Sequence, residues 1–281
     1  MTGAGTTALE LRHVSKAYPR PGVLGRKPSF RALDDISLAI THGDVVGIVG
    51  ESGSGKSTLA QIAVGLIPPS AGEVLHDGTS LAVLARTPPQ QWRPRVQMVF
   101  QDSSGALNPR KTVGRCLGET LALRGVAAAG RIAEARALLA LVGLGAEVMT
   151  RLPHELSGGQ RQRVGLARAL AMKPEVLIAD EPVSSLDVSL QAQIINLLAR
   201  LTRELNLTLI FISHDLALVR SLCRCVVVMY GGRIVEEGLC ADVFAHPAQD
   251  YTRRLLAAVP RGLSQQRQTA TMPVLISTSA S

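Results

Sequence analysis

The feature that most constrains the fold is the loop GESGSGKS at residues 50–57. It fits the pattern G-x-x-x-x-G-K-[ST], in which glycines let the backbone approach a triphosphate and backbone N–H groups hold the phosphate oxygens. The run DVVGIVG at 44–50 is short, apolar and β-branched, as a buried strand should be, and STLAQIAVGL continues as a helix. This order of strand, loop and helix is the context that the motif needs, and it predicts a phosphate-binding loop in an α/β domain.

We expect this loop and the start of its helix to form the nucleotide site. Lys56 would neutralise charge on the β- and γ-phosphates, and the Ser57 hydroxyl would bind Mg²⁺. Only five of the 30 basic residues are lysines, so a lysine inside this loop stands out. The predicted nucleotide-binding residues of the loop are Gly50, Glu51, Ser52, Gly53, Ser54, Gly55, Lys56, Ser57 and Thr58.

Polar residues follow three other apolar runs. VLIADE, at 176–181, places Asp180 to hold Mg²⁺ and Glu181 to act as general base or to position the attacking water. Taken alone this pattern ends many strands, and it gains weight from the loop at 50–57. His214 in FISHD is by itself more often a core histidine, but ligands collect at such strand ends in open α/β sheets, which favours a contact with the γ-phosphate. Gln101 in VFQD also ends a strand, and by itself it is uninformative.

The remaining patterns predict an α/β fold with a mainly parallel sheet, since strands alternate with helices. The first 50 residues predict an antiparallel β region, and SLQAQIINLLARLTREL, at 189–205, predicts an amphipathic helix. We interpret residues 8–260 as one domain that contains a helical subdomain at about 103–170, and residues 261–281 as a loose tail. Within the helical subdomain, one helix presents apolar residues at helical spacing, namely Ile132, Ala135, Leu138, Leu139 and Val142.

Composition limits the function classes. Apolar residues make up 46% and charged residues 19%, which is typical of a soluble globular protein, and no apolar run approaches the length of a membrane span. No secretory signal is expected. The net charge is +8, but the arginines are scattered and aromatic residues are 3%, so we expect no nucleic-acid partner. The four cysteines are expected to be plain thiols, with Cys223 and Cys225 on one face of a strand.

One ordered set of motifs extends these expectations. GESGSGKST, VFQD, LSGGQRQR, VLIADEP, SSLD and FISHD together resemble the nucleotide-binding subunit of an ABC transporter, over about residues 8–240. In that family two ATPase domains pack head to tail, and each ATP lies between the P-loop of one and the LSGGQ of the other. The resemblance implies that the signature residues contact the partner's ATP in trans; they are Leu156, Ser157, Gly158, Gly159 and Gln160.

The resemblance also implies roles for single residues. Tyr18 would stack on adenine, and Gln101 would touch the metal or the attacking water and couple to the membrane partner. Asp187 in SSLD would signal across the dimer interface, and His214 would sense the γ-phosphate. The implied cofactors are ATP and Mg²⁺.

Finer placement comes from two further stretches. QDSSGALNPRKTVG and VVVMYGGRIVEEG…HPAQDYTRRLLAAVP resemble the dipeptide, oligopeptide and nickel importer branch, and within it the second ATPase subunit. MYGG stands where Met-Tyr-Leu-Gly is more usual, and HPAQDYT where His-Pro-Tyr-Thr is, which leaves peptides, nickel and metal chelates open as cargo. The implied partners are a second ATPase subunit (non-identical, or a copy of this chain), two permease subunits and an extracytoplasmic solute-binding protein. The chain would lie at the cytoplasmic face of the membrane.

Three alternatives remain at this point. A soluble ABC ATPase of DNA repair or translation usually has two cassettes or long coiled coils, whereas this chain has one cassette and no sustained heptads. Exporter ATPases are commonly fused to their membrane domain. A regulator that binds nucleotide without hydrolysis would not need Lys56, Asp180, Glu181, Ser157 and His214 together.

Overall fold

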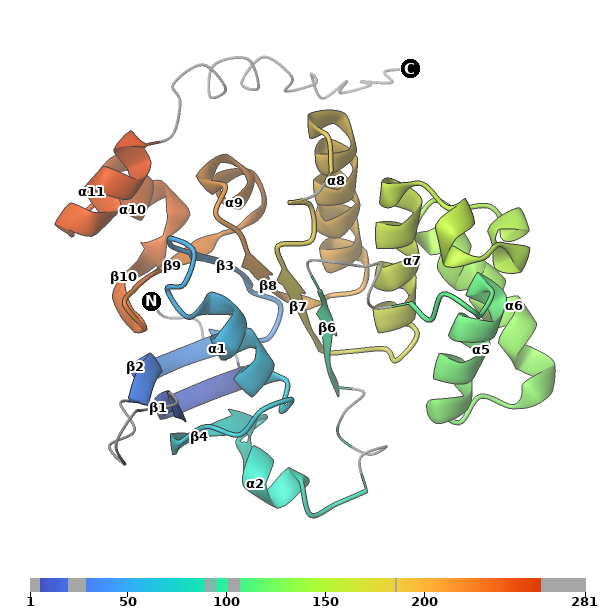
Figure 1. Cartoon of the computed structure of the whole chain (residues 1–281), viewed down its shortest axis with the longest axis horizontal. Helices are drawn as coiled ribbons and strands as arrows, with labels where there is room; N and C mark the ends of the chain where they lie inside the picture. Colours follow the sequence, from blue (N-terminus) through green and yellow to red (C-terminus); the bar gives the residue numbers. More distant parts are fainter. Residues whose placement is uncertain are drawn as a thin grey trace, which may run out of the picture.

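The P-loop lies on a six-stranded sheet. The computed structural model describes residues 6–19, 29–88, 92, 95–100, 107–184 and 186–258. The sheet has the order β10-β9-β3-β8-β7-β6, in which only β10 runs antiparallel to its neighbour (Figure 1). The predicted α/β class with a mainly parallel sheet is confirmed. The strands are β3 (Val45–Val49), β6 (Val96–Val99), β7 (Val176–Asp180), β8 (Thr208–Ile212), β9 (Cys225–Tyr230) and β10 (Arg233–Leu239).

Successive side chains of this sheet point into two different cores. In β8, Leu209 and Phe211 belong to the core under the helices, whereas Ile210 and Ile212 belong to the core shared with the second sheet. All five residues of β8 are buried, as are all five of β7. A strand covered on both faces reads as a continuous apolar run, which is why these segments are recognisable in the sequence.

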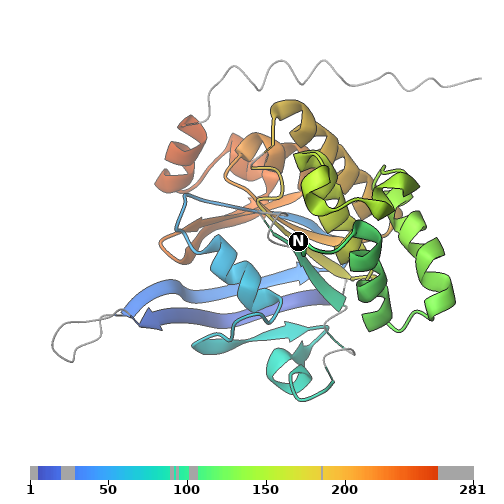
Figure 2. The same ribbon diagram turned by 45° about the vertical axis from the view of Figure 1, so that its right-hand side comes forward.

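A second, antiparallel sheet forms the N-terminal region. Its order is β2-β1-β4-β5, with β1 (Thr7–Pro19), β2 (Ser29–Thr41), β4 (Ala71–His76) and β5 (Thr79–Ser80). Helix α1 (Lys56–Ala63) packs into the core that the two sheets share, and Figure 2 shows it crossing the long β1–β2 ribbon. The predicted antiparallel β region is confirmed, and it places β2 directly beside the P-loop.

Helices surround the other face of the six-stranded sheet. They are α8 (Val188–Glu204), α9 (Leu216–Leu222), α10 (Cys240–Ala245) and α11 (Asp250–Ala257), while the short α2 (Leu81–Leu84) follows β5. Helix α8 is the predicted amphipathic helix, and it buries Ile194, Leu198 and Leu201, whereas Leu205 lies at its C-terminal cap and is 43% exposed. No helix in the described ranges is long and apolar enough to cross a membrane.

The segment from 107 to 170 is helical and stands to one side of the sheet (Figure 1). It contains α5 (Val113–Leu123), α6 (Ala128–Leu141), α7 (Gly158–Leu170) and the 3-10 turns Ala146–Thr150 and Pro153–Glu155. Ile132 is 60% exposed, so its predicted place on the apolar face of α6 is wrong. The buried residues of α6 all come from Ala135 onward, so the first turn carrying Ile132 remains uncovered. The division of the chain into domains stays a prediction.

The cysteines are free, and one of them lies outside the strand that was expected to hold it. All four thiols are free, with Cys116, Cys223 and Cys240 buried. Cys223 is the C-terminal cap of α9, and β9 begins only at Cys225, so the shared strand face is wrong. Burial raises the pKa of the Cys223 thiol, and raises that of Cys240 to about 11. Because the thiolate is the reactive form, these two thiols are inert packing groups.

The two glycines of the β9–β10 turn are not equivalent. Gly232 has φ +81° and donates its N–H to Ser54 O at 3.1 Å, and a Cβ there would lie 2.8 Å from the carbonyl oxygen of Ala32. Gly231 has φ +56°, and a Cβ there would meet nothing within 4 Å. The structure therefore requires glycine at 232 for space and leaves room for a side chain at 231, where the importer branch more usually has leucine.

We predict that Gly232→Ala destabilises the protein more than Gly231→Ala. Both alanines adopt an unfavourable φ, which costs about 1 kcal/mol, but only the first also forces backbone apart, at about 1–3 kcal/mol more. Urea unfolding of the two variants measures the difference. Equal unfolding free energies would show that the turn does not pack against β2 as described.

Candidate nucleotide site

The loop between β3 and α1 is shaped by close backbone contacts. A Cβ on Gly50 would lie 2.2 Å from Met229 O, and one on Gly55 would lie 2.6 Å from Ala32 O. Gly53 has open space around it, but its φ is +82°. Gly50 and Gly55 therefore exclude any side chain because strands β9 and β2 press against the loop, whereas Gly53 is needed only for its backbone conformation.

Lys56 is buried inside the loop. Its Nζ donates to the carbonyl oxygens of Gly50 and Glu51, both at 2.8 Å, and lies 3.3 Å from Ser54 Oγ. Burial lowers the pKa of Lys56, while the nearby carboxylates of Glu181, Asp180 and Glu51 oppose that shift. The ammonium is thus held by backbone carbonyls in the concavity where the sequence predicts phosphate.

Asp180 ends β7 beside Ser57 and is buried. Burial raises its pKa, although a hydrogen bond from Ser57 opposes that shift. Its Oδ1 has no hydrogen-bond partner among the described residues. Carboxylate and hydroxyl oxygens are ligands that Mg²⁺ prefers, and a cation here would satisfy the orphaned oxygen. Ser57 and Asp180 therefore fit the predicted metal site, while Gln101 lies outside the described residues.

Glu181 follows Asp180 and is fixed by its backbone. It has φ +45°, its N–H donates to Ile212 O at 2.9 Å, and its carbonyl accepts from Ser184 N at 3.3 Å and Ser184 Oγ at 3.2 Å. A non-glycine residue in this conformation is strained, and such strain persists where surrounding bonds impose it. Ser184 was missed by the sequence analysis, because nothing in its local pattern distinguishes it from other loop serines.

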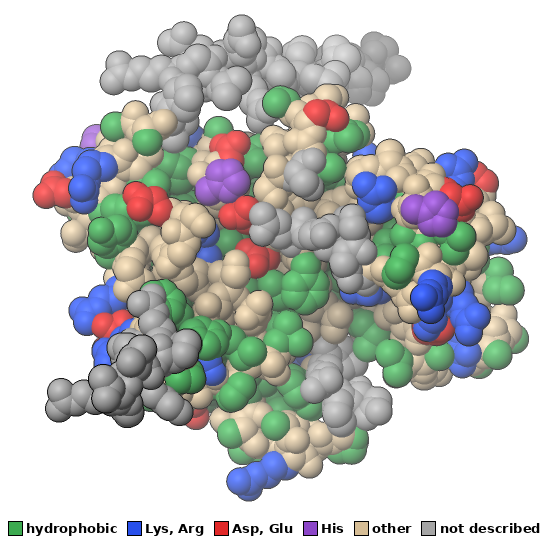
Figure 3. Space-filling model, in the orientation of Figure 1, with side chains coloured by type: hydrophobic (Ala, Val, Ile, Leu, Met, Phe, Trp, Pro, Cys, Tyr) green, Lys and Arg blue, Asp and Glu red, His purple; other side chains and the backbone are tan. Residues whose placement is uncertain are grey.

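His214 lies next to Glu181. Its Nδ1 is 3.3 Å from Glu181 Oε1, and its side chain is 62% exposed, which excludes the alternative of a core histidine. Figure 3 shows acidic and histidine side chains near the middle of the molecular face that is turned toward the viewer. Lys56, Ser57, Asp180, Glu181 and His214 are thus brought together where β3, β7 and β8 end.

The LSGGQ run forms the start of α7. The Ser157 hydroxyl accepts from Gln160 N at 3.2 Å while Ser157 N–H donates to Gln160 Oε1 at 3.0 Å, so the two form a capping box. A Cβ on Gly159 would lie 3.1 Å from Leu190, and one on Gly158 would lie 3.2 Å from Leu186. Ser157 is exposed and Leu156 is buried. In the described part of the chain, no hydrogen bond or ion pair joins this run to the loop at 50–57.

The structure also describes the surroundings of Asp187 and Tyr18, two further residues for which the sequence analysis predicts a role. Asp187 is the N-terminal cap of α8, where its Oδ1 accepts from Leu190 N at 2.9 Å. Tyr18 pairs with Phe30 near the end of the β1–β2 ladder, and Lys16 Nζ lies 5.4 Å from its ring centroid. Tyr18 is 36% exposed. The signalling role of Asp187 and the adenine contact of Tyr18 stay predictions.

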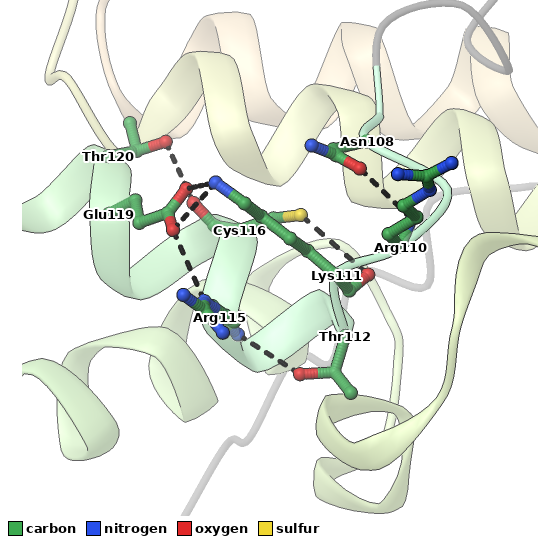
Figure 4. A network of polar contacts seen from close by, with 8 residues as sticks. All are labelled: Asn108, Arg110, Lys111, Thr112, Arg115, Cys116, Glu119 and Thr120. Carbon is green, nitrogen blue, oxygen red and sulfur yellow. Dashed lines mark hydrogen bonds and ion pairs between the residues drawn. The ribbon is translucent and has the colours of Figure 1, made fainter.

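The described end of the segment that resembles the importer branch, from Asn108 on, is bonded to α5 (Figure 4). Lys111 Nζ lies 2.7 and 2.8 Å from the two carboxylate oxygens of Glu119, and Arg115 Nε lies 3.4 Å from the same group. Thr112 caps the helix by accepting from Arg115 N at 3.4 Å. Lys111 and Thr112 are therefore anchored to α5.

Fold and site together define a P-loop ATPase. A glycine loop between a parallel strand and a helix, with a lysine, a metal-suited aspartate and a glutamate at adjacent strand ends, is the arrangement of that class. A family model described as "ABC transporter" matches residues 33–184. A second, described as "AAA domain, putative AbiEii toxin, Type IV TA system", matches residues 150–220.

The chain is similar along most of its length to curated bacterial proteins. It is 45% identical over 256 residues to a putative peptide import ATP-binding protein of Brucella ovis, covering 91% of this chain and 79% of that protein. It is 49% identical over 255 residues to a probable peptide ABC transporter ATP-binding protein of Sinorhizobium fredii, covering 90% and 72%.

Solved structures of ABC cassettes are also similar to this chain. The dimeric post-hydrolysis structure of the ATP-binding cassette MJ0796 bound to ADP and Pi has a TM-score of 0.71 and 28% identity, covering 83% of this chain and 98% of that one. CbiO1 from Clostridium perfringens, part of the ABC transporter complex cbiONQ, has a TM-score of 0.74 and 29% identity, covering 91% and 97%. The chain belongs to the ABC transporter family, as an ATP-binding ATPase domain.

We predict that Asp180→Asn stabilises the nucleotide-free protein at pH 8. A carboxyl whose folded pKa is raised loses stability as pH rises through that pKa, and asparagine carries no charge to bury. The melting temperature should rise by about 2–4 °C for each kcal/mol gained, and the gain should shrink as the pH falls through the raised pKa of Asp180. Asp187→Asn is the control, because asparagine caps a helix as well as aspartate. A gain that grows as pH falls would contradict the burial of a costly charge.

Proposed function

We propose that the chain is the ATP-hydrolysing subunit that energises peptide import through separate permease subunits. The observation that carries the hydrolytic part is the cluster of Lys56, Asp180, Glu181 and His214 at neighbouring strand ends. The direction and cargo are supported by relatives named for peptide import in Brucella and by the likeness to a peptide ABC transporter protein of Sinorhizobium. These names favour import over export and peptides over nickel.

In the proposed site, the loop at 50–57 holds the triphosphate through its backbone N–H groups. Lys56 turns its ammonium from the loop carbonyls toward the β- and γ-phosphates. Ser57 and Asp180, with Gln101 beyond the described residues, hold Mg²⁺, which neutralises phosphate charge when bound. Tyr18 stacks on the adenine.

Glu181 is proposed as the general base or water-positioner. The bonds from its backbone to Ile212 and Ser184 fix the direction of its side chain. Its carboxylate accepts the proton of a water that attacks the γ-phosphorus, or aligns that water for attack. His214, 3.3 Å away, restrains the carboxylate and senses the γ-phosphate.

The signature run is proposed to act on a partner's nucleotide. The exposed N-terminus of α7 offers unpaired N–H groups and the positive end of the helix dipole. As the family resemblance implies, a second ATPase domain facing this run head to tail supplies the phosphate, which the dimeric structure of the similar cassette MJ0796 supports. Dimer closure is then favoured by contacts that exist only with ATP between the subunits, which is the condition for a ligand to shift a conformational equilibrium. Asp187, at the cap of α8, relays closure across the interface.

The remaining partners are those that the family resemblance implies. Movement would pass through Gln101 to two permease subunits, and a solute-binding protein would deliver the peptide from outside. The chain would be peripheral, at the cytoplasmic face of the membrane.

Ser157→Arg should leave ATP binding by the isolated chain unchanged. An arginine there blocks the partner's phosphate but does not contact this chain's own loop. Assembled with its partner subunit, the variant should lose about 10²–10³ in hydrolysis, the usual effect of removing one anion-stabilising donor group. His154→Arg, which also adds an arginine at an exposed position of this surface, is the control. Weaker ATP binding by isolated Ser157→Arg protein would contradict the role in trans.

Uptake tests the transport function as a whole. In a strain that lacks this chain, the wild-type protein should restore uptake of a labelled dipeptide. Glu181→Gln should bind ATP yet hydrolyse it about 10²–10⁴ times more slowly, the usual effect of removing a general base, and it should not restore uptake. Restored nickel uptake without dipeptide uptake would show that the cargo is wrong, and normal hydrolysis by Glu181→Gln would show that the base is wrong.

A further inference from the structure

Three contacts join the P-loop to the C-terminal elements of the chain. The Cα of Gly50 lies so close to β9 that an added Cβ would be 2.2 Å from Met229 O. The N–H of Gly232, in the β9–β10 turn, donates to Ser54 O at 3.1 Å. The N–H of Glu51 donates to the hydroxyl of Tyr251, on α11, at 3.0 Å. Met229, Gly232 and Tyr251 thus connect the P-loop to β9, to the β9–β10 turn and to α11.

Tyr251 is held firmly enough to act as a fixed acceptor. It is 7% exposed, and its ring stacks on Tyr230 of β9 with centroids 4.3 Å apart. The start of α11 is fixed as well, because the carboxylate of Glu236 on β10 accepts from Ala248 N at 2.7 Å and from Gln249 N at 3.1 Å. The hydroxyl is therefore presented to the P-loop by α11, which is tied to β9 through Tyr230 and to β10 through Glu236.

The peptide groups on the two sides of Glu51 are then fixed separately. Its N–H is held by Tyr251 from outside the loop, and its carbonyl oxygen is held by Lys56 from inside at 2.8 Å. Glu51 itself is exposed and lies directly after Gly50. Without the tyrosine hydroxyl, the Glu51 N–H would lose its partner, while the carbonyl oxygen of Glu51 would keep its bonds from Lys56 Nζ and from Ser54 N, the latter at 3.2 Å.

We propose that Tyr251 is a positioning residue for nucleotide binding. It touches no nucleotide itself, but it holds the first turn of the P-loop in the conformation that binds phosphate, so that less ordering is needed when nucleotide arrives. The proposal rests on the loop at 50–57 being the nucleotide site.

The same contacts account for the unusual stretch HPAQDYT. Compared with His-Pro-Tyr-Thr, the residues Ala248, Gln249 and Asp250 intervene before the tyrosine. Glu236 binds the N–H groups of the first two, and Asp250 begins α11. The extra residues are thus absorbed at the helix start, and Tyr251 still reaches Glu51.

The test compares Tyr251→Phe with Tyr230→Phe. Both substitutions keep the stacked rings, but only the first removes the hydroxyl that accepts from Glu51. Calorimetric titration with ADP and Mg²⁺ should show the dissociation constant of Tyr251→Phe raised about fivefold, as expected for one lost hydrogen bond, and that of Tyr230→Phe unchanged. Without nucleotide, the melting temperature of Tyr251→Phe should fall by no more than about 2–4 °C, the cost of one hydrogen bond, and that of Tyr230→Phe should be unchanged. In the assembled transporter, Tyr251→Phe should raise the KM for ATP and leave kcat unchanged.

Other outcomes overturn the proposal or its foundation separately. If Tyr251→Phe binds ADP like the wild type while Lys56→Ala loses binding, the loop is the site and the tyrosine does not position it. If Tyr251→Phe lowers the melting temperature and kcat together, its role is general stability. If Lys56→Ala binds ADP normally, the proposed nucleotide site itself is wrong.

Discussion

The site depends on one packing constraint, which is that the P-loop backbone is pressed between β2 and β9. At Gly50 and Gly55 the neighbouring carbonyl oxygens leave no space for a Cβ. Tight packing of backbone on backbone removes alternative loop conformations without using side chains, so the N–H groups on the open side remain available to an anion. The antiparallel N-terminal sheet and the β9–β10 hairpin therefore shape the candidate nucleotide site.

The six-stranded sheet positions the acidic side chains of the candidate site, and this placement lowers the stability of the nucleotide-free protein. Alternate residues of each strand enter different cores, so the strands are rigid up to their carboxyl ends, where Asp180 and Glu181 emerge. There Asp180 is buried with one oxygen unpaired among the described residues, and Glu181 has a strained φ. Both features disfavour the nucleotide-free protein, and in the proposed site both serve the binding of a metal ion and a phosphate. Stability and ligand affinity are thus opposed at the same two residues.

The sequence predicted what depends on local pattern and missed what depends on distant contacts. The P-loop, the two-sided buried strands and the strand-end carboxylates all have local signatures, because glycine spacing and apolar runs are read within about ten residues. Tyr251 contacts a residue 200 positions earlier. Ser184 contributes through a hydrogen bond to the backbone of Glu181. The residues next to Tyr251 and Ser184 in the sequence show no pattern that predicts either bond. Ile132 and Cys223 were misplaced for the same reason, since helical or alternating spacing does not show which turn is covered or where a strand begins. Gln101 lies outside the described residues, and the trans role of the signature run needs a second subunit.

The capping box at the start of α7 explains why that position suits a serine. The Ser157 hydroxyl already accepts from Gln160 N, but a hydroxyl both accepts and donates, so its proton remains available for a phosphate oxygen. Aspartate caps helices as well as serine does, and Asp187 does so at α8. At Ser157, however, a carboxylate would only accept and would repel the phosphate. In the proposed arrangement α7 faces the partner's ATP, so its N-terminal cap must be neutral and still able to donate a hydrogen bond. The N-terminal cap of α8 can be acidic.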